Sequence, residues 1–367
     1  MNFPAANLTS FHSEVLQQTA LGQLCGKSQL FRERYQILRL LGRGGFGVTF
    51  LAKDMNLPGN PLCVIKQLCP KFSDPTAIKV ARERFRKEAK ALSLLGNHSQ
   101  IPLLLDYFVM GEEFYLVQEY IKGVTLARLV RRHGHLSEAT VTRFLKDMLS
   151  LLRYIHSRGV IHRDIKPQNV ILAQEDRRLV LIDFGAVKHQ IARLDSSARE
   201  HSTEFIGTVG FAPPEQFSLR PVYASDIYAL GATCLYLLTG KAPLDFNRNL
   251  RNNQIYWRDE VQVSTTLGDI LDKMLQVCLI DRYRCATAIL QVLEQEQDPT
   301  NLQHCLSFQP NIHEFAHSKH HQSNADDEGY QSPAVRSAIA IREWKARCRE
   351  KHLRRQSRQA KQMLSNS

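Results

Sequence analysis

Short apolar runs, separated by turn residues, dominate the chain after residue 34. Five runs have the length and the β-branched or aromatic content of strands, and they cover residues 35–41, 48–51, 61–68, 101–109 and 113–119. Glycines lie between the first two runs and favour a tight turn there. This part of the chain is therefore predicted to form a small antiparallel sheet.

Helical spacing appears between the third and fourth runs and again after residue 125. Residues 82–95 place four apolar side chains on one side of a helix: Phe85, Ala89, Leu92 and Leu95. Residues 137–156 form a long amphipathic pattern that Ser137 is placed to cap. Further helices are predicted at 225–239, 267–275 and 286–294, with a short strand at 179–182. The whole pattern predicts an α+β fold.

Composition divides the chain into four parts. Residues 1–33 are polar and mixed, and are predicted to be a loosely structured extension of a domain at 34–297. Residues 298–334 are polar and contain five histidines, as expected of a flexible linker, and their spacing offers no rigid set of metal ligands. Residues 335–367 form a basic, helical pattern.

The formal net charge of the 367-residue chain is +12, and much of it is local. Residues 336–361 contain ten Lys or Arg against two Glu, a net +8, so the remainder is only mildly basic. No apolar run approaches the roughly 20 residues of a membrane span, and no secretory leader is apparent. Eight cysteines form no C-x-x-C pair, which favours reduced thiols. The expectation is a soluble, cytoplasmic protein without a transmembrane segment.

The first candidate chemistry is a phosphate site in the predicted sheet. Gly42, Gly44 and Gly47 lie between two strands, where backbone N–H groups can approach phosphates that a side chain would block. Lys66 ends an apolar strand and can reach phosphates as a point charge. Its expected partner is Glu88, because Glu88 falls within the apolar side of helix 82–95. The competing residue, Glu83, lies nearer the start of that helix.

A second group of polar residues follows residue 161. Asp164 is the expected base or orienting group for an attacking hydroxyl, and Lys166 can neutralise charge on a transferring phosphoryl group. Asn169 and Asp183 offer two oxygen ligands for a metal that keeps part of its hydration, as Mg²⁺ does. The residues after Asp183 are Phe184 and Gly185, an apolar anchor and a permissive backbone position.

Residues 35–296 resemble a eukaryotic-type serine/threonine protein kinase domain as found in bacteria, most like cyanobacterial members. Three further sequence segments support the resemblance. Residues 118–123 are similar to the hinge that binds adenine through backbone groups, residues 207–216 to the end of the activation segment, and residues 226–231 to the helix start that braces the catalytic loop.

The resemblance implies a two-lobed, protein-kinase-like fold, with a sheet-containing N-lobe at about 34–120 and a mainly helical C-lobe at about 121–297. It implies a regulatory enzyme that transfers the γ-phosphate of ATP to protein serine or threonine, using Mg²⁺ or alternatively Mn²⁺. Glu119 and Ile121 become candidate adenine contacts, and Lys166 and Thr208 favour serine or threonine over tyrosine. Glu215 should pair with a distal arginine, which is expected to be Arg282, with Arg284 as its rival.

Regulation by phosphate is a further expectation of the resemblance. Arg163 precedes Asp164, and in the family such an arginine helps to bind a phosphate on the activation loop. The candidate acceptors for autophosphorylation are Ser196, Ser197, Ser202 and Thr203, of which Ser202 and Thr203 are preferred. The alternative is a constitutively ordered loop that carries no phosphate.

Three alternatives remain open for the basic tail at 336–361. It could contact nucleic acid or ribosomes, lie on an anionic membrane surface through Trp344 and neighbouring isoleucines, or be a solvated end without a fixed partner. For the whole chain, the rival functions are a kinase-shaped scaffold that presents this tail and a small-molecule kinase. The complete set of catalytic residue types opposes the scaffold, and residues 207–215 favour a protein substrate.

Overall fold

The computed structural model describes residues 17, 19–43, 47–68, 75–185, 187–189, 210–249 and 253–295, all within one compact unit that spans residues 1–301. The predicted linker at 298–334 and the basic tail lie outside the described residues, as does most of the segment between Gly185 and Gly210. Within the described part of the chain, no helix combines the length and the apolar composition that crossing a bilayer requires.

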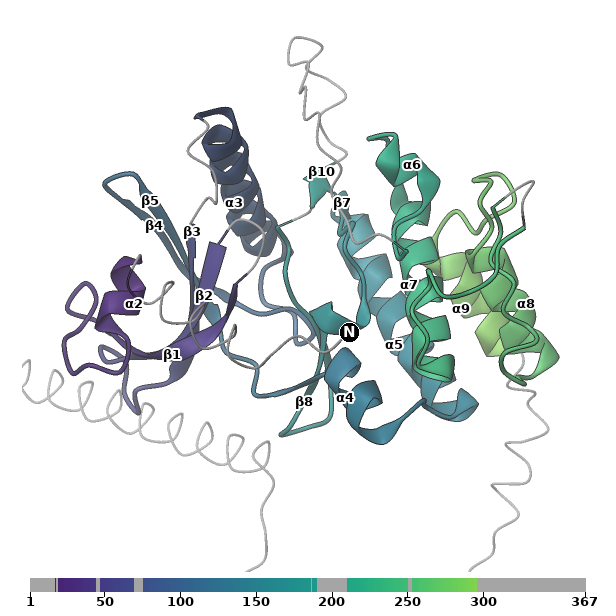
Figure 1. The fold of residues 1–367 in the computed structure, drawn as a ribbon, viewed down its shortest axis with the longest axis horizontal. Helices are drawn as coiled ribbons and strands as arrows, with labels where there is room; N and C mark the ends of the chain where they lie inside the picture. The colour runs from purple at the N-terminus through teal and green to yellow at the C-terminus, as the bar shows by residue number, and fades with distance from the viewer. Residues whose placement is uncertain are drawn as a thin grey trace, which may run out of the picture. The chain divides into compact units, whose positions relative to one another are not determined.

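The N-lobe contains a five-stranded antiparallel sheet in the order β1-β2-β3-β5-β4 (Figure 1). Its strands are β1 (Tyr35–Arg43), β2 (Gly47–Asp54), β3 (Leu62–Leu68), β4 (Leu104–Met110) and β5 (Glu113–Glu119). Neighbouring strands in this order are paired throughout, so the connection from β3 to the edge strand β4 must pass over β5. The predicted antiparallel sheet is confirmed.

Helix α3 (Pro75–Leu95) provides that crossover and packs against β4 and β5. The four predicted apolar side chains on its inner side are all buried, so the predicted amphipathic face is confirmed. The helix begins at Pro75 rather than near residue 82, because proline is favoured in a first helical turn, where its missing N–H has no helical partner. Strand β4 likewise begins at Leu104, three residues after the predicted start.

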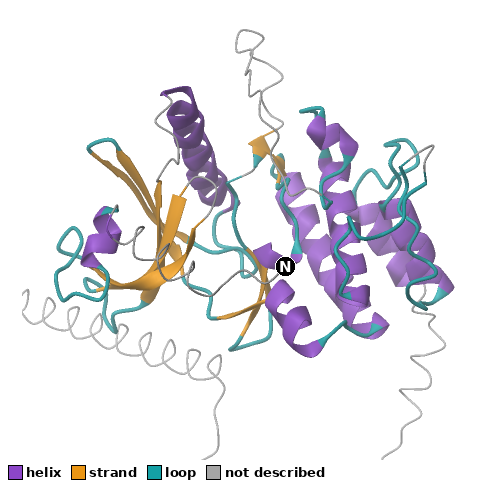
Figure 2. Ribbon diagram, viewed as in Figure 1, coloured by secondary structure: helices purple, strands orange, loops and turns teal. Residues whose placement is uncertain are grey.

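The C-lobe is mainly helical (Figure 2) and contains α4 (Leu126–His133), α5 (Glu138–Ser157), α6 (Pro214–Phe217), α7 (Tyr223–Thr239), α8 (Thr265–Met274) and α9 (Ala286–Gln295). Helix α5 packs against α7 and α9, and α7 packs against α8. The Ser137 hydroxyl accepts a hydrogen bond from the Thr140 N–H, so the predicted cap of α5 is confirmed.

Short strands and one 3-10 turn carry the loops of the candidate site. Strands β6 (Gly123–Thr125), β8 (Val170–Ala173) and β9 (Leu179–Leu181) form one small sheet, and β7 (Val160–Ile161) pairs with β10 (Lys188–His189). The 3-10 turn η1 (Pro167–Asn169) leads directly into β8. Buried side chains of α3, α5 and α7 belong to one hydrophobic cluster, which therefore joins the two lobes.

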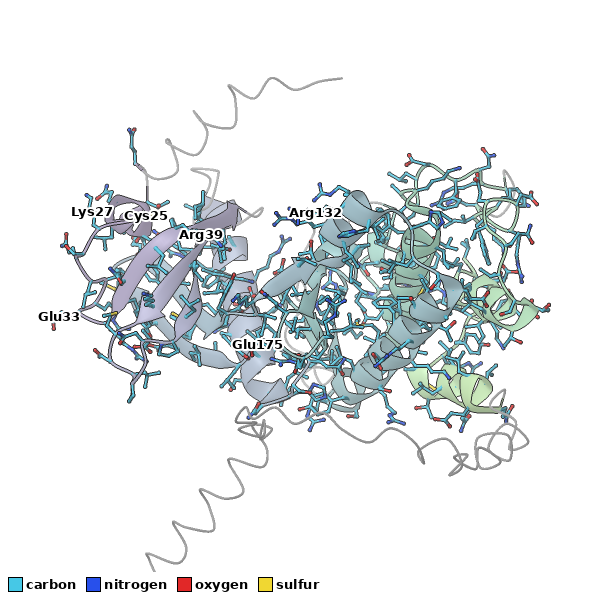
Figure 3. The ribbon with its side chains drawn as sticks, turned by 90° about the horizontal axis from the view of Figure 1, so that it is seen from below. Cys25, Lys27, Glu33, Arg39, Arg132 and Glu175 are labelled. Atoms are coloured by element: carbon cyan, nitrogen blue, oxygen red, sulfur yellow. The ribbon has the colours of Figure 1, made fainter. Side chains whose placement is uncertain are left out.

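For residues 19–33, the structure corrects the prediction of a loosely structured extension. Helix α2 (Ala20–Leu24) is capped by Thr19, and its Leu21 side chain is fully buried among sheet residues. The Gly26 N–H donates to the Ile37 carbonyl of β1 at 2.9 Å, and the Cys25 thiol lies beside the same strand (Figure 3). The Leu21 N–H donates to the Gln67 side chain of β3 at 3.3 Å. Residues 19–33 are therefore part of the N-lobe.

We expect Leu21→Ala to lower the free energy of unfolding by about 2–4 kcal/mol, because it removes a fully buried aliphatic side chain. Urea unfolding monitored by circular dichroism measures this change in the free energy of unfolding. The control is Gln23→Ala in the same helix, whose exposed side chain should matter by less than about 0.5 kcal/mol. Equal stability of the two variants would contradict the burial of α2 against the sheet.

Candidate active site

Lys66 on β3 lies between two carboxylates from distant parts of the chain. Its ammonium group is 2.5 Å from the Glu88 carboxylate on α3 and 3.4 Å from that of Asp183, which follows β9. Glu83 instead pairs with Arg86 at 2.8 Å on the surface of α3. The structure thus pairs Lys66 with the preferred glutamate and links both lobes through the lysine.

Lys66 attracts both carboxylates of this cluster, whereas the two carboxylates repel each other. Burial disfavours the Lys66 ammonium, but the attraction of Glu88 and Asp183 outweighs it and raises the pKa of Lys66 above its ordinary value. The Lys66 charge lowers the pKa of Asp183. Lys66 and Asp183 are therefore both charged at neutral pH, which suits groups that face phosphates and a cation.

The loop from β7 to η1 brings the second group of predicted residues together. The Lys166 ammonium is 2.7 Å from one oxygen of the Asp164 carboxylate. The Asn169 side-chain amide donates to the same oxygen at 2.9 Å and to the Asp164 carbonyl at 2.8 Å. Asp164 is therefore oriented by two neighbours of its own loop.

The two groups face one another across a short backbone link. The Ile182 N–H donates to the Asn169 carbonyl at 2.8 Å, which fixes the segment carrying Asp183 beside the loop carrying Asp164. Lys166 also contributes to lowering the pKa of Asp183. The structure thus brings together the six polar residues predicted for the site, namely Lys66, Glu88, Asp164, Lys166, Asn169 and Asp183.

Asp226, at the start of α7, holds the loop from within the core. Its fully buried carboxylate accepts hydrogen bonds from the N–H groups of His162 at 2.9 Å and Arg163 at 2.8 Å. The His156 ring of α5 lies 2.9 Å from the same carboxylate. Arg163 adopts a left-handed backbone conformation with φ of 71°, which is costly for a residue with a side chain. These hydrogen bonds offset that cost and fix the turn before Asp164.

Phe184 anchors the loop that carries Asp183. The Phe184 ring is fully buried and meets the His162 ring edge-on, with ring centroids 4.8 Å apart. Asp183 itself has φ of 70°, so its neighbours must hold a strained backbone in place. An added Cβ at Gly185 would lie 3.3 Å from the Glu88 carboxylate, so this loop also packs closely against the lysine partner.

The predicted nucleotide-binding positions on the N-lobe are described in part. An added Cβ at Gly47 would lie only 2.7 Å from the Gln67 carbonyl, so close strand packing requires glycine there. At Gly42 an added Cβ would meet no atom within 4 Å, and Gly44 lies outside the described residues. Glu119 ends β5, where its N–H donates to the Leu103 carbonyl, and Ile121 follows in the connection to β6, with its side chain buried.

The structure selects Arg282 over Arg284 as the partner of Glu215. The buried Arg282 guanidinium is 2.7 Å from the Glu215 carboxylate and also donates to the Ala224 carbonyl at 3.0 Å. The Ser225 hydroxyl donates to the same carboxylate at 2.8 Å. Thr208, the other predicted residue of this segment, lies outside the described residues.

Two residues of this network were not predicted from the sequence. His156 contacts Asp226 as described above, and the Gln216 side-chain amide donates to the Arg163 carbonyl at 2.6 Å. Gln216 is 1% exposed, so its polar side chain needs an internal partner. The signal available for Gln216 was its position next to Glu215 in the segment that resembles the end of the activation segment. His156 gave no such signal, because a histidine in the last turn of a helix is common.

Comparison with known proteins agrees with this geometry. The family model described as the protein kinase domain matches residues 35–293, and the chain belongs to this family. The fold expected from the resemblance, with its sheet-containing N-lobe and helical C-lobe, is confirmed by this match and by the structure.

Among curated relatives, the chain is 51% identical over 276 residues to serine/threonine-protein kinase B of Synechocystis sp., which covers 74% of this chain and 48% of the relative. It is 42% identical over 269 residues to serine/threonine-protein kinase PknA of Nostoc sp., covering 72% of this chain and 48% of that relative. The chain spans about half the length of these relatives. The predicted similarity to cyanobacterial members is confirmed.

We expect the stability of the protein to fall in acid partly through Asp226. Burial opposes ionisation, but His156 and the backbone N–H groups outweigh it, so the pKa of Asp226 is lowered. A carboxylate whose folded pKa lies below its unfolded value of about 3.9 stabilises the fold above that pH, and the contribution is lost as pH falls through the folded pKa. Asp226→Asn removes this contribution and leaves one backbone donor without an acceptor.

Urea midpoints measured from about pH 6 to about pH 3 test this expectation. Asp226→Asn should be less stable at neutral pH, by an order of 1–3 kcal/mol, and should lose less of its stability on acidification than the wild type. Asp147→Asn, at an exposed position of α5, should follow the wild-type profile. Parallel profiles for wild type and Asp226→Asn would contradict the assigned role.

Proposed function

We propose that this chain is an ATP-dependent protein kinase that phosphorylates serine or threonine. The observation that carries the proposal is the charge cluster of Lys66, Glu88 and Asp183, joined through the Ile182–Asn169 hydrogen bond to Asp164 and Lys166. Membership of the protein kinase family and similarity to relatives named serine/threonine-protein kinases support it.

The N-lobe residues would bind the nucleotide. Backbone N–H groups around Gly42, Gly44 and Gly47 would approach the phosphates, and Lys66 would neutralise them while Glu88 holds its ammonium group in place. The backbone groups of Glu119 and Ile121 would contact adenine. Phosphoryl transfer needs mostly positioning and charge stabilisation, which a preorganised lysine supplies.

The donor set near Asp183 fits a hard divalent cation. Both amide hydrogens of Asn169 are directed at Asp164, which leaves the Asn169 side-chain carbonyl as an acceptor, and the Asp183 carboxylate is 49% exposed. Two oxygen ligands of this kind suit Mg²⁺, with Mn²⁺ as the alternative, because such ions take their remaining ligands from phosphates and water. The cation would neutralise phosphate charge when bound.

The C-lobe loop would act on the protein substrate. The Asp164 carboxylate, oriented by Asn169, would accept a hydrogen bond from the attacking hydroxyl and direct its oxygen toward the γ-phosphate. Lys166 would offset negative charge that develops on the transferred group. The Asp164-to-Lys166 spacing and Thr208 support serine or threonine rather than tyrosine as acceptor. The dependence on ATP supports a cytoplasmic location for these residues.

Asp164→Asn should lower transfer of labelled phosphate from ATP to proteins of the host by at least about 100-fold, because the amide cannot act as base. Asp147→Asn, at an exposed position on α5, is the matched control and should retain wild-type activity. Equal labelling by wild type and Asp164→Asn would refute the role of Asp164. Absence of activity in the wild type under all metal and substrate conditions would favour the scaffold alternative.

We also propose that phosphate on the activation segment regulates this site. The Arg163 side chain is buried, its Nε has no hydrogen-bond partner among the described residues, and burial together with the nearby Arg84 charge lowers the pKa of Arg163 to about 10. The guanidinium remains charged at neutral pH with some support from the Asp226 carboxylate, so an anion beside it would further stabilise a buried cation. Autophosphorylation of Ser202 or Thr203 would supply one.

Comparison of phosphorylated and phosphatase-treated enzyme tests this mode of regulation. Phosphate should raise the activity of the wild type by at least about tenfold and leave Arg163→Ala unchanged, because the added charge acts through Arg163. Phosphopeptide mapping should find the modification at Ser202 or Thr203, with Ser196→Ala/Ser197→Ala as the control. An active enzyme without phosphate between Gly185 and Gly207 would exclude the proposal.

A further inference from the structure

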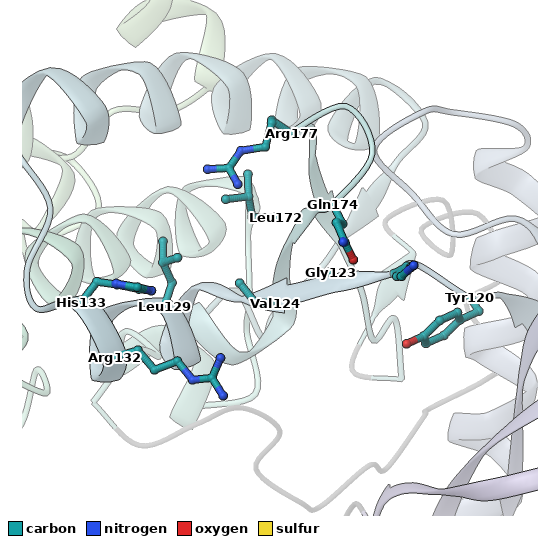
Figure 4. A pocket seen from close by; sticks show the side chains of 10 residues that line it. Tyr120, Gly123, Val124, Leu129, Arg132, His133, Leu172, Gln174 and Arg177 are labelled. Carbon is teal, nitrogen blue, oxygen red and sulfur yellow. The ribbon is translucent and has the colours of Figure 1, made fainter. Parts of the chain in front are cut away.

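A basic pocket lies beside the connection between the lobes, on elements that carry none of the proposed catalytic side chains. Its volume is about 420 Å³, and it is formed by β6, α4 and the turn between β8 and β9 (Figure 4). Val124, Leu129 and Leu172 provide apolar surface within it. We call this feature the hinge-side pocket.

Four basic side chains line the hinge-side pocket, and no carboxylate does. They are Lys122, Arg132, His133 and Arg177, all exposed. None of the four has an ion-pair partner among the described residues, whereas the neighbouring Arg178 pairs with Asp176 at 2.6 Å and with Glu119 at 3.7 Å. Three of these groups are permanently charged at neutral pH, so the pocket concentrates positive charge that the described part of the fold does not neutralise.

Local structure explains only part of this charge. Arg132 and His133 occupy the last turn of α4, where cations interact favourably with the partial negative charge of the helix end. Lys122 precedes β6 and Arg177 belongs to the β8–β9 turn, so neither takes part in that interaction. Gly123 brings these elements together, because an added Cβ would lie 2.3 Å from the Leu172 carbonyl. Close strand packing therefore gathers basic residues from three segments.

We propose that the hinge-side pocket is a docking site for an acidic, leucine-containing segment of a partner protein. The apolar surface of Val124, Leu129 and Leu172 suits an aliphatic side chain, and the surrounding cations suit carboxylates on either side of it. A nucleic-acid backbone would offer phosphates to the cations but no aliphatic side chain to the apolar surface between them. The proposal concerns binding alone, so it stands or falls independently of the proposed kinase activity.

Fluorescence anisotropy with the whole 367-residue chain tests the proposal. The probe is a short fluorescein-labelled peptide in which leucines alternate with runs of aspartate and glutamate, at about 150 mM salt. Wild type should bind it, and Arg132→Glu/Arg177→Glu should weaken binding by at least about tenfold. The matched control is Arg128→Glu/Arg131→Glu, which changes the same charge at exposed α4 positions that do not line the pocket and should alter affinity less than threefold.

The basic tail is present in every variant, so its attraction for the probe cancels in the comparison. A second probe with serine in place of leucine should bind at least about fivefold more weakly, because it cannot use the apolar floor. Equal losses in the two double variants, or no binding by the wild type, would overturn the proposal. So would a single-stranded RNA that displaces the peptide and loses affinity specifically in Arg132→Glu/Arg177→Glu.

Discussion

The buried carboxylate of Asp226 is the constraint on which the candidate site depends. It accepts hydrogen bonds from two backbone N–H groups of the loop that carries Asp164, and it lies beside His156 of α5. Its charge therefore links α7 to that loop and to α5. The position of α7 in the core makes this possible, because most side chains of this helix are buried and apolar, and Asp226 is buried with them. The strained turn at Arg163, and with it the direction of Asp164, follows from these contacts.

A charge cluster centred on Lys66 connects the N-lobe to the loop that carries Asp183. Lys66 lies on a central strand of the sheet, and its two carboxylate partners come from α3 and from the loop after β9. Removal of the lysine charge would leave the buried Glu88 carboxylate without its cation and facing the Asp183 carboxylate, which is costly. The same cluster therefore favours one placement of α3 and gives a lysine whose charge is directed toward the loop bearing Asp183.

Much of this arrangement could be predicted from the sequence, and the remainder has definite physical reasons. The buried side of α3 and the choice of Glu88 over Glu83 follow from helix periodicity, and the cap at Ser137 follows from the preference of serine for the N-cap position. Both are local information. The choice between Arg282 and Arg284 needed the tertiary structure, because the two arginines are close in sequence and only one reaches Glu215. Helix α2 was missed because five residues have little intrinsic helical stability and depend on burial of Leu21.

Two adjacent residues of strand β3, Lys66 and Gln67, make contacts on opposite faces of the sheet. Side chains of neighbouring strand residues point to opposite faces of the sheet. Lys66 therefore faces the charged site, while the Gln67 side chain accepts a hydrogen bond from the Leu21 N–H of α2 on the other face. The family match begins at Tyr35, but the buried hydrophobic cluster behind the sheet includes residues from earlier in the chain. A fragment trimmed to the family boundary would leave the buried Gln67 without its hydrogen-bond donor and uncover an apolar face directly behind the lysine. The evolutionary and the physical limits of this domain are therefore different.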